Sequence, residues 1–107
     1  MAQEKEIIRR IYERLSEELP EWDIKIQDGA IIARFNSKNV KYNTDMYIRV
    51  DNNGIRIEVF MPDKNGNYVI MRDKAIPASR AIISIYHDNV DRLVEIAASA
   101  ALMLAYM

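Results

Sequence analysis

Apolar residues recur at two spacings along this chain, a helical spacing near both ends and a two-residue alternation between them. The first helical stretch covers residues 3–19 and ends before Pro20, which cannot continue a helix. Its remaining positions are mostly charged, with opposite charges three or four residues apart, which predicts an amphipathic helix with a solvated outer face. The apolar positions are Ile7, Ile8, Ile11, Tyr12, Leu15 and Leu19.

The second helical stretch, residues 89–107, is amphipathic for two turns and then apolar on every side. After those turns only Ser99 and the hydroxyl of Tyr106 are polar. A helix that is apolar all round must be covered all round, and a single sheet covers one side. The alternative is that the first helix and residues 73–88 cover the other side within one chain. We expect instead a homodimer, with a second copy packed on Ile96, Ala100, Met103 and Met107.

The dipeptide Asp28-Gly29 separates two alternating segments and predicts a β-hairpin with a primed two-residue turn, because glycine accepts positive φ. When residues are paired by counting outward from this turn, Asp23 lies opposite Arg34, an opposite-charge pair on the face that the apolar pairs do not occupy. This register agrees with the hydrophobic pattern, so both observations predict the same hairpin. Counting outward from the turn places three apolar pairs on one face, namely Ile26–Ile31, Ile24–Ala33 and Trp22–Phe35.

A second hairpin is predicted around Asn53-Gly54. Its core face would pair Val50 with Ile57 and Ile48 with Val59. Opposite charges at facing positions support this register, since such pairs stabilise a sheet. The pairs on the outer face would be Asp51–Arg56, Arg49–Glu58 and Tyr47–Phe60.

Residues 68–72 predict a fifth strand that follows a five-residue loop and returns along the second hairpin. The expected neighbours are Met61–Val69, Val59–Met71 and Phe60–Ile70. For residues 73–88 two interpretations remain open. The β-branched residues of 81–86 favour a sixth strand, and Pro77 could instead begin a helix. Asp88 is the predicted N-cap of the last helix.

The order of these elements defines an α+β fold. We predict one domain, residues 1–107, with an N-terminal helix, an antiparallel β-meander of five or six strands, and a C-terminal helix packed on one sheet face. Both helices are expected on that same face.

The search for chemistry gives few candidates. The chain has no cysteine and one histidine, His87, which precedes the last helix. The segment Asp63-x-Asn65-x-Asn67 begins like a calcium loop, but the glycine and glutamate of that motif are misplaced. No glycine-rich phosphate loop occurs. We therefore predict a protein that is not an enzyme, with no cofactor and no metal.

Charge narrows the functional classes. The net charge is −1, while residues 31–80 carry 9 basic and 5 acidic groups, a net +4. The apolar run 96–107 has 12 residues, against the roughly 20 needed to span a bilayer, so no membrane association and a cytoplasmic location are expected. Aromatic and arginine side chains on the outer sheet face indicate a binding surface. The candidates are Tyr47, Arg49, Arg56, Phe60, Tyr68 and Ile70, with Lys38, Lys41 and Tyr42 in the connection before the second hairpin.

Two functions fit this surface. The first is a small homodimeric binding protein, a protein–protein adaptor or chaperone-like module. The alternative is a nucleic-acid-binding dimer in which basic and aromatic side chains of the outer face contact a strand. Salt dependence separates the two, because phosphate binding weakens steeply with salt.

Overall fold

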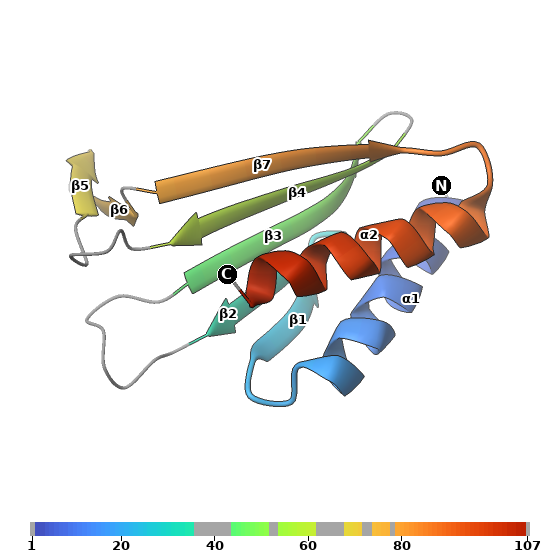
Figure 1. The fold of residues 1–107 in the computed structure, drawn as a ribbon, viewed down its shortest axis with the longest axis horizontal. Coiled ribbons are helices and arrows are strands. Elements are labelled where there is room, and N and C mark those ends of the chain that lie inside the picture. The colour runs from blue at the N-terminus through green and yellow to red at the C-terminus, as the bar shows by residue number, and fades with distance from the viewer. Residues whose placement is uncertain are drawn as a thin grey trace.

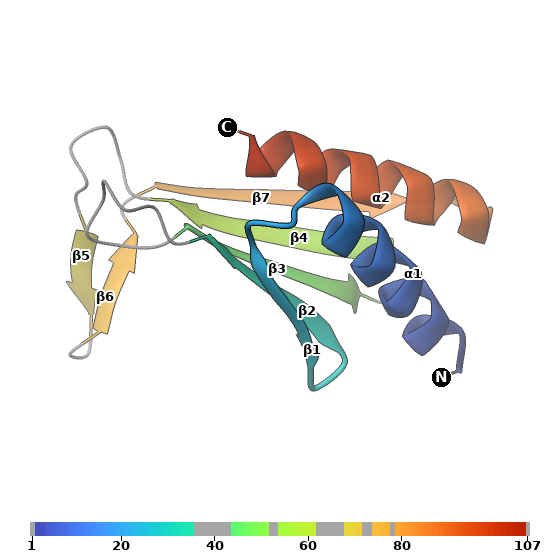
Figure 2. The same ribbon diagram turned by 90° about the horizontal axis from the view of Figure 1, so that it is seen from below.

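The computed structural model describes residues 2–35, 44–51, 54–61, 68–71, 74–77 and 79–106. It confirms the α+β fold: two helices lie on one face of a five-stranded antiparallel sheet (Figures 1 and 2). The helices are α1 (Ala2–Glu18) and α2 (Val90–Ala105). The sheet has the order β1 (Asp23–Gln27), β2 (Ala30–Phe35), β3 (Thr44–Asp51), β4 (Gly54–Met61) and β7 (Ser79–Tyr86). A separate two-stranded sheet contains β5 (Tyr68–Met71) and β6 (Lys74–Pro77).

Helix α1 buries its apolar stripe and exposes its charged face, as the residue spacing predicts. Ile11 and Leu15 are fully buried. On the outer face Arg9 pairs with Glu6 and with Glu13, and the hydrogen bond to Glu6 lowers the pKa of that carboxyl. All three side chains are about half exposed, so these pairs contribute little to stability.

The core face of the sheet contains a row of five isoleucines, one from each strand. The backbone register joins Ile26 to Ile31, Ile31 to Ile48, Ile48 to Ile57 and Ile57 to Ile83. The three central members of the row are fully buried, while Ile26 and Ile83 lie on the edge strands and are partly exposed. The helices pack on the core face that contains this row.

The two helices divide the core face between them. Helix α1 packs on β1, β2 and β3, and α2 packs on β4 and β7. They also pack against each other, and an ion pair of 2.8 Å joins Arg10 Nη1 to Asp91 Oδ1. Helix α1 therefore covers one flank of α2 within the chain, which agrees with part of the alternative considered for the apolar C-terminal helix.

The first hairpin has the predicted register. Asp23 pairs with Arg34, Ile24 with Ala33 and Ile26 with Ile31. Asp28 and Gly29 both have positive φ, 54° and 78°, as a type I′ turn requires. The rings of Trp22 and Phe35 stack with centroids 5.4 Å apart.

The predicted register of the second hairpin is wrong by two residues, although the two faces are assigned correctly. Val50 pairs with Ile55 rather than Ile57, and Ile48 pairs with Ile57 rather than Val59. Gly54 is not a turn residue but the first residue of β4, opposite Asp51. A shift of two residues keeps each side chain on its face, so the hydrophobic pattern fits both registers equally well.

The corrected register changes the charge pairs on the outer face. Arg49 lies opposite Arg56, not Glu58, and Tyr47 lies opposite Glu58, not Phe60. Replacing Arg49 by glutamate would therefore remove a repulsion between like charges and create an attraction. We expect Arg49→Glu to raise the free energy of unfolding by up to about 1 kcal/mol in urea denaturation at low salt. Arg49→Gln should give a smaller gain, and a loss of stability in the glutamate variant would instead support the pairing with Glu58.

The partner of β4 also differs from the prediction. Met61 pairs with Ser79 and Phe60 with Arg80, whereas pairing with Val69 and Ile70 was expected. Strand β7 offers β4 eight paired positions, and β5 has four residues in all, so β7 satisfies more of the backbone of β4. Strand β5 pairs with β6 instead, in a hairpin that projects beyond the ends of β4 and β7 (Figure 1).

Residues 79–86 form the strand that their β-branched side chains favour, and not a helix begun by Pro77. The N-cap of α2 is Asn89 rather than Asp88. The Asn89 side chain accepts a hydrogen bond of 3.1 Å from the backbone N–H of Arg92. Both residue types can cap a helix, so sequence alone places such a cap only to within a residue.

Candidate binding face

The sheet has a second face, which we call the outer face, on the side away from both helices (Figure 2). Its side chains are those that alternate with the core residues along each strand. The larger described members are Lys25, Ile32, Arg34, Asp45, Tyr47, Arg49, Arg56, Glu58, Phe60, Ile82 and Tyr86.

Tyr47 and Phe60 form the aromatic centre of this face. Their rings meet edge to face with centroids 5.6 Å apart, because the two residues lie diagonally across β3 and β4. Both side chains are half-buried, and Ile32 lies directly opposite Tyr47 on β2. Burial of the phenol raises the pKa of Tyr47, so its hydroxyl stays protonated at neutral pH.

Carboxylates lie beside two arginines of the outer face. Arg34 Nε donates to Asp45 Oδ1 at 2.8 Å, and this hydrogen bond raises the pKa of Arg34. Arg56 Nε is buried and lies 3.0 Å from Glu58 Oε1, close enough for an ion pair, without the alignment of a hydrogen bond. The predicted partner of Arg34 was Asp23, which is its cross-strand neighbour, but its ion pair is formed with Asp45 on the other side.

The described side chains of this face are balanced in charge. Four are acidic and four are basic, a net charge of zero, and they are Asp23, Asp45, Asp51, Glu58, Lys25, Arg34, Arg49 and Arg56.

The surface of the outer face is not smooth. A shallow pocket of about 190 Å³ lies over β1–β3, between Lys25, Ile32, Arg34 and Tyr47.

Four predicted surface residues, Tyr47, Arg49, Arg56 and Phe60, share the outer face. Tyr68 and Ile70 do not belong to the five-stranded sheet, because β5 pairs with β6. The other three, Lys38, Lys41 and Tyr42, lie outside the described residues.

The predicted binding surface left out several members of the face. Ile32 and Arg34 were available from the alternation along residues 30–35, since they have the opposite phase to Ile31 and Ala33. Ile82 and Tyr86 could not be assigned without knowing that β7 is the neighbour of β4.

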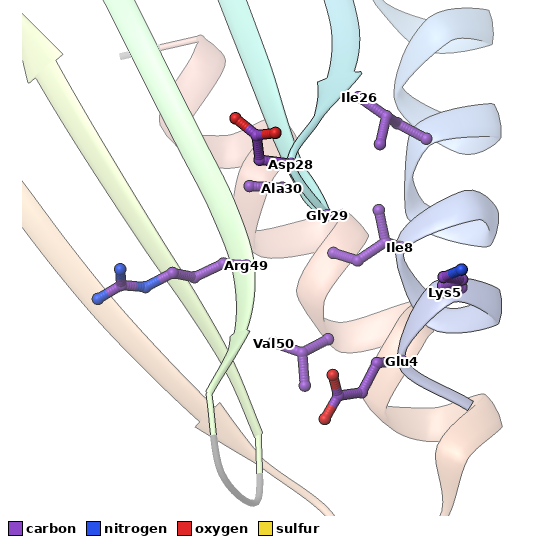
Figure 3. A pocket seen from close by; sticks show the side chains of 9 residues that line it. All are labelled: Glu4, Lys5, Ile8, Ile26, Asp28, Gly29, Ala30, Arg49 and Val50. Carbon is purple, nitrogen blue, oxygen red and sulfur yellow. The ribbon is translucent and has the colours of Figure 1, made fainter. Parts of the chain in front are cut away.

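A larger hollow of about 680 Å³ opens between α1, the β1–β2 turn and the end of β3 (Figure 3). The side chains of Ile8, Ile26 and Val50 lie between the helix and the sheet, while Glu4 and Lys5 come from the first turns of α1. Arg49 borders the hollow with its backbone, and its side chain extends away from α1. The sequence pattern gave no signal for this hollow, because it depends on how far α1 lies from the edge of the sheet.

The predicted dimer residues lie on α2 with different exposures. Ile96 is 41% exposed and Met103 is 73% exposed, whereas Ala100 packs partly against the core. Met107 lies outside the described residues.

His87 is exposed just before α2, and its Nδ1 accepts a hydrogen bond of 3.0 Å from the backbone N–H of Asn89. It therefore helps to shape the entry into the helix. Across residues 2–35, 44–51 and the other described segments, no three His, Cys, Asp or Glu side chains are grouped to hold a metal ion. The described helices are too short or too polar to span a bilayer.

Comparison with known proteins adds no relative. No family model matches the sequence, and neither the curated proteins nor the solved structures contain a significant match.

Proposed function

We propose that this chain is a small, non-enzymatic, homodimeric binding protein, an adaptor or chaperone-like module that holds a partner protein on its outer sheet face. The observation that carries the proposal is the aromatic centre of that face. Tyr47 and Phe60 pack against each other on the side of the sheet that neither helix covers. Aromatic and arginine residues are the types that dominate binding energy at protein interfaces.

The aromatic centre is held in position before a partner arrives. Tyr47 is fixed by its contact with Phe60 and by the neighbouring Ile32, so little rotamer freedom would be lost on binding. The hydroxyl of Tyr47, whose pKa burial raises, is protonated at neutral pH and can donate a hydrogen bond. An apolar centre with a surrounding ring of charged groups matches the anatomy of protein interfaces.

The charge pattern favours a protein partner over a nucleic acid. A single strand is bound by unpaired cations that neutralise phosphates. On this face Arg34 and Arg56 already lie beside Asp45 and Glu58, at 2.8 and 3.0 Å. A phosphate backbone would have to approach these carboxylates as well as the arginines.

A selection of peptides against the wild-type protein tests the proposal. We expect selected peptides to perturb the NMR signals of Ile32, Tyr47 and Phe60 and to leave those of exposed α1 residues unchanged. Tyr47→Ala and Phe60→Ala should each weaken peptide binding at least about tenfold, as expected for truncated hot spots. Calorimetry measures the affinity, and thermal unfolding confirms that each variant is folded.

The matched control is Gln3→Ala, an exposed position on α1, on the other side of the sheet from the aromatic centre. It should leave the affinity unchanged. Peptides that bind elsewhere on the molecule, or equal losses in the control, would contradict the proposal. Titration with single-stranded oligonucleotides tests the alternative, and binding that weakens steeply with salt would favour a nucleic-acid partner.

A further inference from the structure

Strand β7 is an edge strand with the features of a pairing site. Within the described segments it pairs with β4 on one side and with no strand on the other. It is eight residues long, with Arg80 near its start and no charged side chain over residues 81–86. A long, apolar edge with free backbone groups is a template for pairing with another strand.

The opposite edge of the sheet differs in each of these respects. Strand β1 has five residues, and Asp23 and Lys25 place charges along it. Short length and charge are the devices that prevent edge strands from pairing with other chains. The helix above that edge, α1, exposes a charged face as well, with Arg9 between Glu6 and Glu13. The two edges of one sheet are therefore not equivalent.

The flank of α2 that points away from α1 lies above the β7 edge. Asp91 marks the flank toward α1, because it pairs with Arg10. Ile96, Ala100 and Met103 follow one another at spacings of four and three residues and lie roughly 120–180° around the helix from Asp91. Since α2 packs on β4 and β7, this second flank faces outward beyond β7. It is apolar, and Met103 is among the most exposed large hydrophobic side chains of the described residues.

A second copy of this chain is the occupant that fits both elements. An antiparallel pair of β7 strands has twofold symmetry, and the same axis places the two α2 helices on the same face of the joined sheet. Strand β7 is about 27 Å long and helix α2 is about 24 Å long. Because these lengths are similar, a single twofold axis can relate both the two strands and the two helices. An interface about 25 Å long that spans both the sheet layer and the helix layer has a projected area of about 500 Å² per subunit. With surface relief this approaches the roughly 800 Å² per partner of a standard interface.

We propose that two copies join edge to edge through β7 and flank to flank through α2, giving one continuous ten-stranded sheet. This inference rests on the homodimer of the proposed function and identifies how it is built. Five strands in each copy supply the ten. The Ile96, Ala100 and Met103 side chains of both copies close the helix layer above the junction.

The junction also completes the outer face. A row across that face runs from Ile32 through Tyr47 and Glu58 to Ile82, and it ends at the free edge of β7. Ile82 is 43% exposed in the single copy, and Tyr86 on the same strand is 64% exposed. In the dimer each meets the β7 of the second copy, so the two aromatic centres belong to one uninterrupted surface.

Light scattering after size exclusion, combined with hydrogen exchange, tests the inference. The wild-type protein should have twice the mass of the 12.5 kDa chain at tens of micromolar. Ile82→Lys and Met103→Lys change exposed positions and should each raise the dimer dissociation constant at least tenfold while far-UV circular dichroism stays the same. Gln27→Lys, an equal change of charge on the edge strand β1, is the matched control and should leave the dissociation constant unchanged.

Hydrogen exchange distinguishes this dimer from others. The β7 amides that point away from β4 should exchange slowly in the dimer and should exchange faster on dilution to monomer. A dimer in which these amides exchange rapidly, or one that Ile82→Lys leaves intact, would overturn the edge pairing and leave the proposed homodimer standing. A wild-type mass of one chain would overturn both.

Discussion

Replacing Ile57 by alanine is expected to lower the free energy of unfolding by about 3 kcal/mol, within the 2–5 kcal/mol range for buried large-to-small changes. Ile57 is fully buried at the centre of the isoleucine row. It pairs with Ile48 on one side and Ile83 on the other, and α2 packs on this part of the sheet. The backbone of a central strand cannot move to fill the space, so most of the cavity should remain.

Urea denaturation measures this loss at one fixed protein concentration, so that any effect of the proposed dimer is the same for every variant. The matched control is Ile26→Ala, the same substitution at the exposed end of the same row. Ile26 lies on edge strand β1 and is 44% exposed, so its removal should cost less than about 1 kcal/mol. Equal losses at both positions would contradict the assignment of the core to the middle of the sheet.

A side chain at position 54 is expected to cost about 2–3 kcal/mol or more of folding free energy, even one as small as alanine. Gly54 does not have positive φ, and its importance comes from crowding by β7. A Cβ at this position would lie 2.1 Å from the carbonyl oxygen of Ile85 and 2.7 Å from the ring of Tyr86. The oxygen belongs to the backbone, so relief would require β4 and β7 to move apart.

Gly29 provides the comparison that separates crowding from backbone conformation. It has φ of 78°, and nothing lies within 4 Å of an added Cβ. Asparagine tolerates the left-handed conformation, so Gly29→Asn should cost less than about 1 kcal/mol, whereas Gly54→Asn should remain strongly destabilising. Thermal unfolding of the two asparagine variants is the measurement. Similar stability of both variants would mean that β7 does not lie close against Gly54.

These two glycines show how far the sequence could predict the fold. At Asp28-Gly29 the turn chemistry and the alternation of apolar residues agree, and the predicted hairpin is confirmed. At Asn53-Gly54 the same rule gave the wrong register. The glycine is needed there for contact with β7, a strand about 30 residues away in sequence, and no local pattern carries that information.

The charge pairs misled the prediction for a related reason. Two opposite-charge pairs supported the register that placed Arg49 against Glu58. In the structure Arg56 lies close to Glu58 along the same strand, and Arg34 pairs with Asp45 across the next pair of strands. Long side chains reach diagonal and same-strand neighbours, so several registers can satisfy the same set of charges.

Part of the candidate binding face could be predicted from the sequence, because the alternation of residues along a strand alone decides which sheet face each side chain occupies. Tyr47, Arg49, Arg56 and Phe60 share the outer face in any register shifted by two residues. The contribution of Ile82 and Tyr86 depends on strand order, and the sequence analysis predicted β5 beside β4, where the structure has β7. The choice between them follows from the longer pairing that β7 offers.

The contact between α1 and α2 has a consequence for biosynthesis. Arg10 and Asp91 are 81 residues apart, yet they pair in the finished fold. While the ribosome extends the chain from its N-terminus, α1 and the first four strands of the meander can associate early. The apolar core face of β4 then stays uncovered until α2 leaves the exit tunnel, so during this interval a nascent chain is exposed to aggregation and to chaperone binding.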